Sequence, residues 1–194
     1  MAAKQFPSRR DKIIVSAIDI IDELGIAGLS TKELAVRQEI AESALYRHFK
    51  SKDDILLEIL KYFAKFDKLI HTSIRENQAG AKENILFFVK MYAEYYENYP
   101  AITAVNYYYT SFLSNPATAE VGQAIYNRRA ACFVELIELA QARGEISDYF
   151  TSEELGEVLY GYFQASVVAW RMKRYSYPLK ARVLTVLEKL LARC

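Results

Sequence analysis

Glycine and proline, the two residues that most often interrupt helices, are scarce in this sequence. Seven glycines and four prolines occur among 194 residues, and the prolines stand where helices would begin or end. Inside a helix, glycine costs about 1 kcal/mol and proline about 3 kcal/mol relative to alanine, so their scarcity favours long helices. Apolar side chains also recur at helical spacing along most of the chain. We therefore predict an all-α protein.

Capping residues divide the sequence into nine predicted helices. Ser8, Ser51 and Thr151 can each accept a hydrogen bond from a first-turn N–H, and Gly25 and Gly144 stand where helices end. The predicted helices span residues 8–24, 31–38, 42–49, 51–76, 82–99, 102–113, 117–143, 151–174 and 178–193.

The stretch from Gly28 to Asp54 places two short helices around a tight turn. Ser30 begins an S-T-K-E sequence that is typical of a capping box, and the apolar positions that follow leave room for only a short connection. Two such helices bury little by themselves, so the first helix must complete their core. This predicts a helix-turn-helix DNA-binding domain over residues 1–52, and a larger helical domain over residues 53–194.

Several functional classes find no support in the sequence. The two cysteines, Cys132 and Cys194, are far apart, the N-terminus has no apolar signal core, and no apolar run reaches the roughly 18–20 residues that cross a bilayer. We expect a cytoplasmic protein without disulfides or membrane spans. Two histidines, no Cys/His cluster, no glycine-rich phosphate loop and no serine elbow argue against an enzyme, a metal site or a cofactor.

Charge alone does not identify a DNA-binding protein here. The net charge is +1, and residues 1–52 hold nine basic against seven acidic side chains, a net of +2. A DNA-binding protein needs a local basic surface rather than a basic total. Lys4, Arg9, Arg10 and Lys12 form a small basic arm, which is either a phosphate contact or a solvated terminus.

The string ALYRHFKSKDDIL, residues 44–56, resembles the TetR family of bacterial transcriptional repressors. The family's DNA-binding domain ends in a leucine-tyrosine-x-histidine-phenylalanine core followed by a lysine, and the resemblance extends over about residues 8–60. It implies DNA binding through the second short helix. The residues that it assigns to DNA are Thr31, Ser43, Ala44, Tyr46, Arg47, His48 and Lys52.

Each assignment also has a physical reason. Tyr46 and His48 join an apolar ring to a polar tip, which suits the sugar-phosphate chain, and Lys52 and Thr31 stand at helix starts that favour phosphate. Ser43, Ala44 and Arg47 are candidates for base edges, where arginine suits guanine and a methyl group suits thymine. Leu45 and Phe49, four residues apart, are expected in the core.

The sequence departs from the family pattern in the turn. Glu39 replaces the usual glycine, and Ala41 replaces a serine that often caps the recognition helix. A left-handed Glu39 and a missing cap would each cost about 1 kcal/mol, so we expect an altered turn and a base register uncertain by one residue.

The resemblance also implies a homodimer, formed by the last two helices, that binds a palindromic operator. Small residues at near-helical spacing, such as Gly161 and Ala165, would let two helices approach closely. The alternative is that this stripe packs only within its own subunit. The predicted interface residues are Gly156, Leu159, Phe163, Val167, Val183 and Leu187.

Eight of the fifteen tyrosines fall between residues 87 and 126. Burying so many hydroxyls requires partners, so we predict a pocket for an apolar or aromatic ligand, with an aromatic core as the competing interpretation. Arg128 or Arg171 is a candidate partner for a ligand carboxylate, and Glu94 for a cation. The predicted pocket residues are Phe88, Met91, Tyr92, Tyr95, Tyr96, Tyr108, Phe112, Tyr126, Phe133 and Trp170.

Together these features predict a regulator, most simply a repressor that is released from its operator when a small-molecule effector binds. An activator is a variant that the sequence does not exclude. The alternative from another class is a helical small-molecule carrier or interaction module without specific DNA binding.

Overall fold

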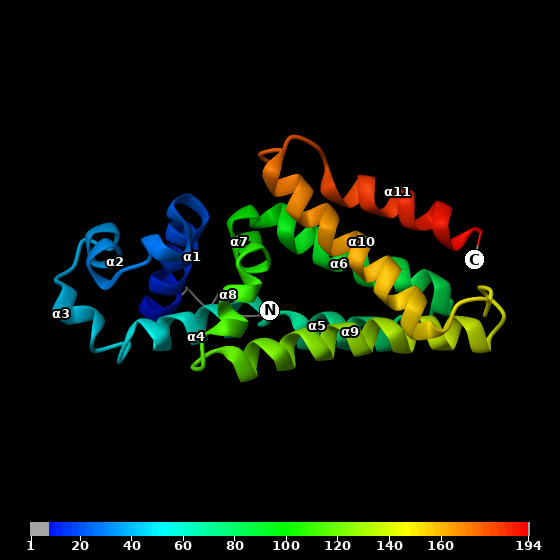
Figure 1. Cartoon of the computed structure of the whole chain (residues 1–194), viewed down its shortest axis with the longest axis horizontal. Coiled ribbons are helices and arrows are strands. Elements are labelled where there is room, and N and C mark those ends of the chain that lie inside the picture. The colour runs from blue at the N-terminus through cyan, green and yellow to red at the C-terminus, as the bar shows by residue number, and fades with distance from the viewer. Residues whose placement is uncertain (1–7, 194) are drawn as a thin grey trace, which may run out of the picture. The chain divides into compact units, whose positions relative to one another are not determined.

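The computed structural model describes residues 8–193, and throughout this range the regular structure is helical, which confirms the all-α prediction (Figure 1). The helices are α1 (Arg9–Gly28), α2 (Thr31–Arg37), α3 (Glu42–Leu45), α4 (Lys52–Phe63), α5 (Asp67–Glu76), α6 (Ala81–Asn98), the 3-10 helix η1 (Pro100–Ile102), α7 (Thr103–Tyr107), α8 (Tyr109–Ser114), α9 (Ala119–Ala142), α10 (Ser152–Met172) and α11 (Leu179–Leu191). Within residues 8–193, no helix is long and apolar enough to cross a membrane.

Two predicted helices are each divided in the structure. The stretch 51–76 breaks between Phe63 and Asp67, where Ala64 ends α4 and Phe66 begins α5 without a side-chain cap. The stretch 102–113 becomes η1, α7 and α8, with Pro100 at the start of η1 and the Thr103 hydroxyl donating to its carbonyl at 2.7 Å. Both breaks fall inside continuous apolar patterns, so periodicity did not reveal them.

The described chain forms two compact units. The first contains the described residues up to Ala64 together with Ala104–Gly122, and the second contains Lys65–Thr103 and the described residues from Gln123 onward. The predicted boundary at residues 52 and 53 lies at the start of α4, inside the first unit. The first unit is therefore built from two separate stretches of sequence.

The first unit joins the predicted DNA-binding domain to a distant segment. Buried isoleucines of α1 pack with α2 and α4, and Ser8 caps α1 in a full capping box with Asp11. The segment 104–122 is fixed by a hydrogen bond from Asn115 Nδ2 to Asp53 Oδ1 at 2.9 Å. Its Tyr109 hydroxyl donates to the Gly122 carbonyl at 2.7 Å.

The second unit is a bundle in which α6, α10 and α11 lie side by side (Figure 1). Polar contacts fix the ends of α6 and α11. Lys82 Nζ donates to the Leu191 carbonyl at 2.8 Å, and the Lys180 N–H donates to Glu97 at 3.0 Å. Thr151 and Glu154 form the capping box predicted for α10.

Candidate functional sites

The turn between α2 and α3 has the two departures that the sequence predicts. Glu39 adopts a left-handed backbone with φ 52°, and Ala41 stands at the N-cap of α3 without a side-chain hydrogen bond. Only half of the capping box predicted for Ser30 is formed: its hydroxyl accepts the Glu33 N–H at 3.1 Å, but the Glu33 carboxylate accepts from Arg37 Nε instead. Arg37 also pairs with Glu23, and its hydrogen bonds to Glu23 and Glu33 raise the pKa of Arg37.

The predicted DNA-contact residues share the surface of α3 and its neighbours. Ser43, Arg47 and Lys52 are exposed, and Tyr46 retains 56% of its surface. By contrast, Leu45 and Phe49 are 1% and 2% exposed, so their prediction as core residues is confirmed. Thr31, Ala44 and His48 are half-buried.

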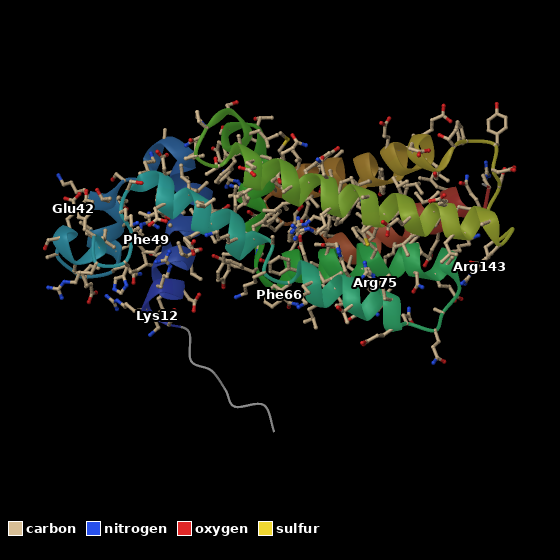
Figure 2. All side chains as sticks on the ribbon, turned by 90° about the horizontal axis from the view of Figure 1, so that it is seen from below. Lys12, Glu42, Phe49, Phe66, Arg75 and Arg143 are labelled. Carbon is tan, nitrogen blue, oxygen red and sulfur yellow. The ribbon has the colours of Figure 1, made fainter. Side chains whose placement is uncertain are left out.

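Glu42 connects the start of α2 to the start of α3. Its carboxylate accepts a hydrogen bond from the Thr31 hydroxyl, so the start of α2 lies beside the start of α3. Glu42 is exposed at the first position of α3, whereas Phe49 lies inside the unit (Figure 2). An acidic group therefore stands among the residues predicted to contact DNA.

Two members of the predicted basic arm hold the DNA-binding domain together. Arg9 donates to the Gln38 carbonyl at 3.1 Å, and Arg10 donates to the His48 carbonyl at 2.6 Å while its guanidinium lies 4.6 Å from the centre of the Phe49 ring. Arg10 also pairs with Glu58. Lys4 lies outside the described residues.

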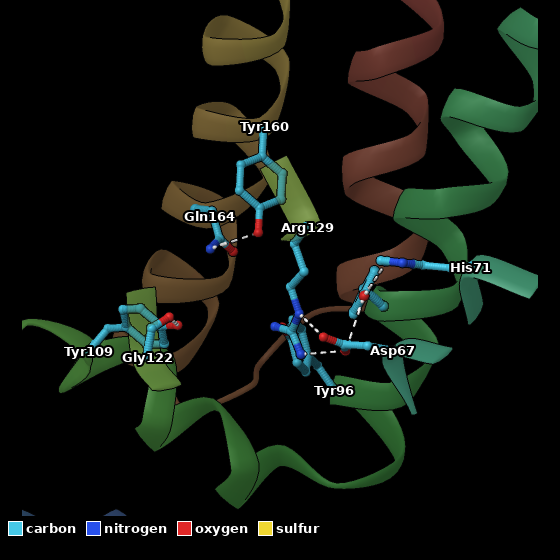
Figure 3. A network of polar contacts seen from close by, with 9 residues as sticks. Asp67, His71, Tyr96, Tyr109, Gly122, Arg129, Tyr160 and Gln164 are labelled. Carbon is cyan, nitrogen blue, oxygen red and sulfur yellow. Dashed lines mark hydrogen bonds and ion pairs between the residues drawn. The ribbon is translucent and has the colours of Figure 1, made fainter. Parts of the chain in front are cut away.

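A buried polar cluster occupies the second unit (Figure 3). Arg129 of α9, 3% exposed, binds Asp67 of α5, 2% exposed, through two hydrogen bonds, Nε to Oδ2 at 2.9 Å and Nη2 to Oδ1 at 2.7 Å. The Tyr92 hydroxyl donates to Asp67 Oδ1 at 3.1 Å and lies 3.3 Å from His71 Nε2. Arg129 Nη1 also reaches the Tyr96 hydroxyl at 3.4 Å.

The surroundings of this cluster determine its charges. Burial alone would lower the pKa of Arg129, but Tyr96 and Asp67 outweigh it and hold that pKa well above its usual value, so the guanidinium is charged. Burial raises the pKa of Tyr92 and lowers the pKa of His71, and both are therefore neutral at pH 7. The pair of Arg129 and Asp67 leaves the cluster with no net charge.

Aromatic rings surround this polar centre. The Arg129 guanidinium lies 4.7 Å from the centre of the Tyr92 ring, and Phe88 lies 4.8 Å from Tyr92 and 5.1 Å from Phe133. The Tyr160 ring lies 5.8 Å from Phe133, and the half-exposed Tyr126 lies 6.3 Å from Tyr160. Phe88, Phe133, Tyr160 and Tyr126 thus form a continuous row of rings, the aromatic row.

The residues predicted to line a pocket are divided between the two units. Tyr108 and Phe112 belong to the first unit. Of those in the second unit, five are buried, namely Phe88, Tyr92, Tyr96, Phe133 and Trp170, whereas Met91 and Tyr95 are half-buried and Tyr126 is exposed. The Trp170 indole N–H donates to the Tyr177 carbonyl at 2.7 Å, which is a structural contact.

Arg129 and Asp67 are the charged residues that reasoning from the sequence missed. The arginines proposed instead are an exposed Arg128 and an Arg171 that donates to the Tyr175 hydroxyl, and Glu94 pairs with Lys180. Helical spacing could have found them, because each missed residue occupies an otherwise apolar stripe. The stripe on α9 is formed by Ile125, Arg129, Phe133 and Ile137. The stripe across the α4–α5 break is formed by Phe63, Asp67, Ile70 and Ile74.

The predicted dimer-interface residues face the interior of the second unit. All six are buried: Gly156, Leu159, Phe163, Val167, Val183 and Leu187. A buried side chain offers no surface to a partner, so this assignment is corrected. A Cβ added to Gly156 would lie 2.8 Å from Val134 Cγ2, so the small residue serves packing within the subunit. The opposite side of α10 exposes Val158, Gly161, Ala165 and Met172.

Comparisons with known proteins cover both units. The family model described as "Bacterial regulatory proteins, tetR family" matches residues 13–59. The fatty acid metabolism regulator protein of Bacillus subtilis (strain 168) is 23% identical over 193 residues, 97% of each chain. The tetracycline repressor protein class C of Escherichia coli is 38% identical over 48 residues, which cover 25% of this chain and 22% of the repressor.

A solved structure extends the likeness to the fold of the whole chain. The transcriptional regulator FadR from Bacillus subtilis, in complex with stearoyl-CoA, superposes with a TM-score of 0.77 at 22% identity, covering 94% of this chain and 98% of that one.

Proposed function

We propose that the chain is a regulator of the TetR family, whose family model matches residues 13–59. In this proposal it is a cytoplasmic repressor that binds a palindromic operator as a homodimer and leaves it when a small molecule binds the second unit. One observation carries the DNA-binding part of the proposal. In the string ALYRHFKSK the large apolar residues Leu45 and Phe49 are buried, while Tyr46, Arg47 and Lys52 are exposed on one short stretch.

The proposed contacts divide into phosphate and base contacts. Tyr46 and His48 pack on the sugar-phosphate chain, and Lys52 and Thr31 bind phosphates at the starts of α4 and α2. Ser43, Ala44 and Arg47 read base edges in the major groove. Thr31 has to exchange its bond with Glu42 for the phosphate.

The dimer uses the exposed side of α10. Val158 and Met172 retain 58% and 68% of their surface, and the exposed Gly161 and Ala165 between them allow close approach of a partner helix. Exposed apolar side chains in such a row are typical of a protein interface. A twofold dimer presents two identical DNA-binding domains, which requires a palindromic site.

The effector is a small, largely apolar or aromatic molecule. The aromatic row from Tyr126 to Phe88 supplies the apolar surroundings that such ligands require. The related FadR structure contains stearoyl-CoA, so compounds with an apolar acyl chain are a rational first class to test.

Operator binding can be tested on the DNA that flanks the protein's own coding sequence. Wild-type protein should give a specific band in a gel shift at moderate salt, and Lys52→Ala should weaken binding and reduce the salt slope by roughly one charge. Lys173→Ala, an exposed lysine of the second unit, is the matched control and should bind as wild type. An unchanged salt slope for Lys52→Ala removes the proposed phosphate contact, and the lack of any specific band contradicts operator binding there.

A further inference from the structure

The pair of Asp67 and Arg129 is not explained by stability. Replacing a buried ion pair with well-packed apolar residues is often neutral or stabilising, because both charges must be stripped of water. The direct neighbours of the pair are the hydroxyls of Tyr92 and Tyr96, and the apolar ring of Phe88 lies 4.8 Å from the Tyr92 ring. A buried ion pair that also binds two tyrosine hydroxyls is therefore a candidate functional site.

The connections of the chain single out the same cluster. The chain passes between the two units after Ala64, after Thr103 and after Gly122. Asp67 is the first residue of α5, which follows the first of these passages, and Arg129 lies on α9, which begins in the first unit and continues into the second. Tyr96 lies near the end of α6, and the chain passes to the first unit soon afterwards, after Thr103. The cluster thus ties together all three segments that connect the units.

The geometry of the pair indicates which ligand group fits. Asp67 presents two oxygens to the parallel N–H groups of the guanidinium, at 2.7 and 2.9 Å. A ligand carboxylate has the same planar shape and charge, so it can take this place without changing the charge of the arginine's partner. The Tyr92 hydroxyl and the N-terminal dipole of α5 remain to stabilise a displaced Asp67.

We propose that Arg129 is the recognition residue of the effector site, and that the effector is an acid with an apolar or aromatic body whose carboxylate displaces Asp67 from the guanidinium. The apolar body lies along the aromatic row that leads through Tyr160 to the half-exposed Tyr126. Release of Asp67 frees the start of α5 from α9. The inference rests on the proposed function, since it names the chemical class of the effector.

Carboxylate probes paired with neutral analogues test the ligand class. Benzoate with benzamide, and decanoate with decanol, are titrated into the full-length wild-type protein, with thermal unfolding and intrinsic fluorescence as readouts. Each acid is expected to bind at least roughly tenfold more tightly than its neutral analogue, because only the acid satisfies the charged guanidinium. Equal affinity for acid and neutral analogue overturns the proposal.

Asp67→Asn tests the displacement directly. The amide keeps the shape but leaves a positive charge without its counterion, so the variant should bind benzoate roughly tenfold more tightly than wild type and gain more thermal stability from it. The matched variant Asp67→Asn with Arg129→Gln has a neutral pair and should lose the preference for acids. If benzoate fails to bind Asp67→Asn more tightly than wild type, or if the double variant keeps the preference, Arg129 is not the recognition residue.

Operator binding is measured separately, which distinguishes the two levels of the proposal. Wild-type protein that shifts operator DNA but does not prefer acids contradicts only the assignment of Arg129. Protein that prefers acids but never shifts operator DNA contradicts the proposed function.

Discussion

Substitution of Gly25 by alanine should destabilise the first unit through two separable effects. Gly25 interrupts α1 with φ 74° and ψ 172°, a conformation that is essentially restricted to glycine. An alanine Cβ at this position would also lie 2.8 Å from the hydroxyl oxygen of Tyr108, whereas the ring Cζ is at an ordinary 3.5 Å.

The two effects have estimable magnitudes. Backbone strain of this kind costs about 1–3 kcal/mol, and the steric overlap adds about 1 kcal/mol. With a urea m-value of about 2 kcal/mol/M, a total loss of about 3 kcal/mol lowers the unfolding midpoint by about 1.5 M. Because Gly25 and Tyr108 both lie in the first unit, the loss should be seen in the transition of that unit.

A double-mutant cycle separates strain from overlap. Tyr108→Phe removes the overlapping oxygen, so Gly25→Ala in that background should cost about 1 kcal/mol less than in wild type, and the difference is the overlap. Urea unfolding followed by far-UV circular dichroism gives all four free energies. If Gly25→Ala changes the free energy of unfolding by less than about 0.5 kcal/mol, the reasoning from backbone conformation is refuted.

Three further predictions concern the buried Leu45, the exposed side of α10 and the half-buried imidazole of His71. Leu45→Ala should lower the free energy of unfolding by about 2–5 kcal/mol because Leu45 is buried, whereas the exposed control Val36→Ala should stay within about 0.5 kcal/mol. Met172→Glu should convert the proposed dimer to a folded monomer in analytical ultracentrifugation, and an unchanged sedimentation coefficient would contradict an interface on this side of α10. Burial lowers the pKa of His71 below its unfolded value of about 6.5, so the unfolded chain binds the proton at a higher pH than the folded protein does. The free energy of unfolding should therefore fall as the pH drops below about 6.5. In urea unfolding between about pH 5 and 7.5, His71→Gln should show a weaker dependence of the midpoint on pH.

Local signals predicted the helix caps, the turn at Glu39 and the core residues Leu45 and Phe49 well. The caps at Ser8 and Thr151, the left-handed Glu39 and the burial of Leu45 with Phe49 all depend on residues a few positions apart, and the structure agrees with each. Such features follow from backbone stereochemistry and helical spacing, which a single sequence contains.

Long-range packing escaped prediction. The association of residues 104–122 with the first unit depends on contacts such as Asn115 with Asp53, which no local pattern encodes. The buried and exposed sides of α10 were also confused, since small and apolar residues occur on both sides of that helix. Arg129 and Asp67 were overlooked because a charge on an apolar stripe is read as a surface residue until its partner on another helix is known.

The discontinuous first unit has a consequence for how the protein folds during synthesis. A ribosome adds about 5–20 residues each second, so α1 to α4 emerge several seconds before Tyr108, Tyr109 and Asn115 are available. Until then the hydroxyl of Tyr108 is not packed beside Gly25, and Asp53 lacks the hydrogen bond from the Asn115 side-chain amide. The DNA-binding domain is therefore completed only after α5 and α6 have been synthesised. A nascent chain that ends at Ala64 should be digested by protease more easily than the same residues in the full-length protein.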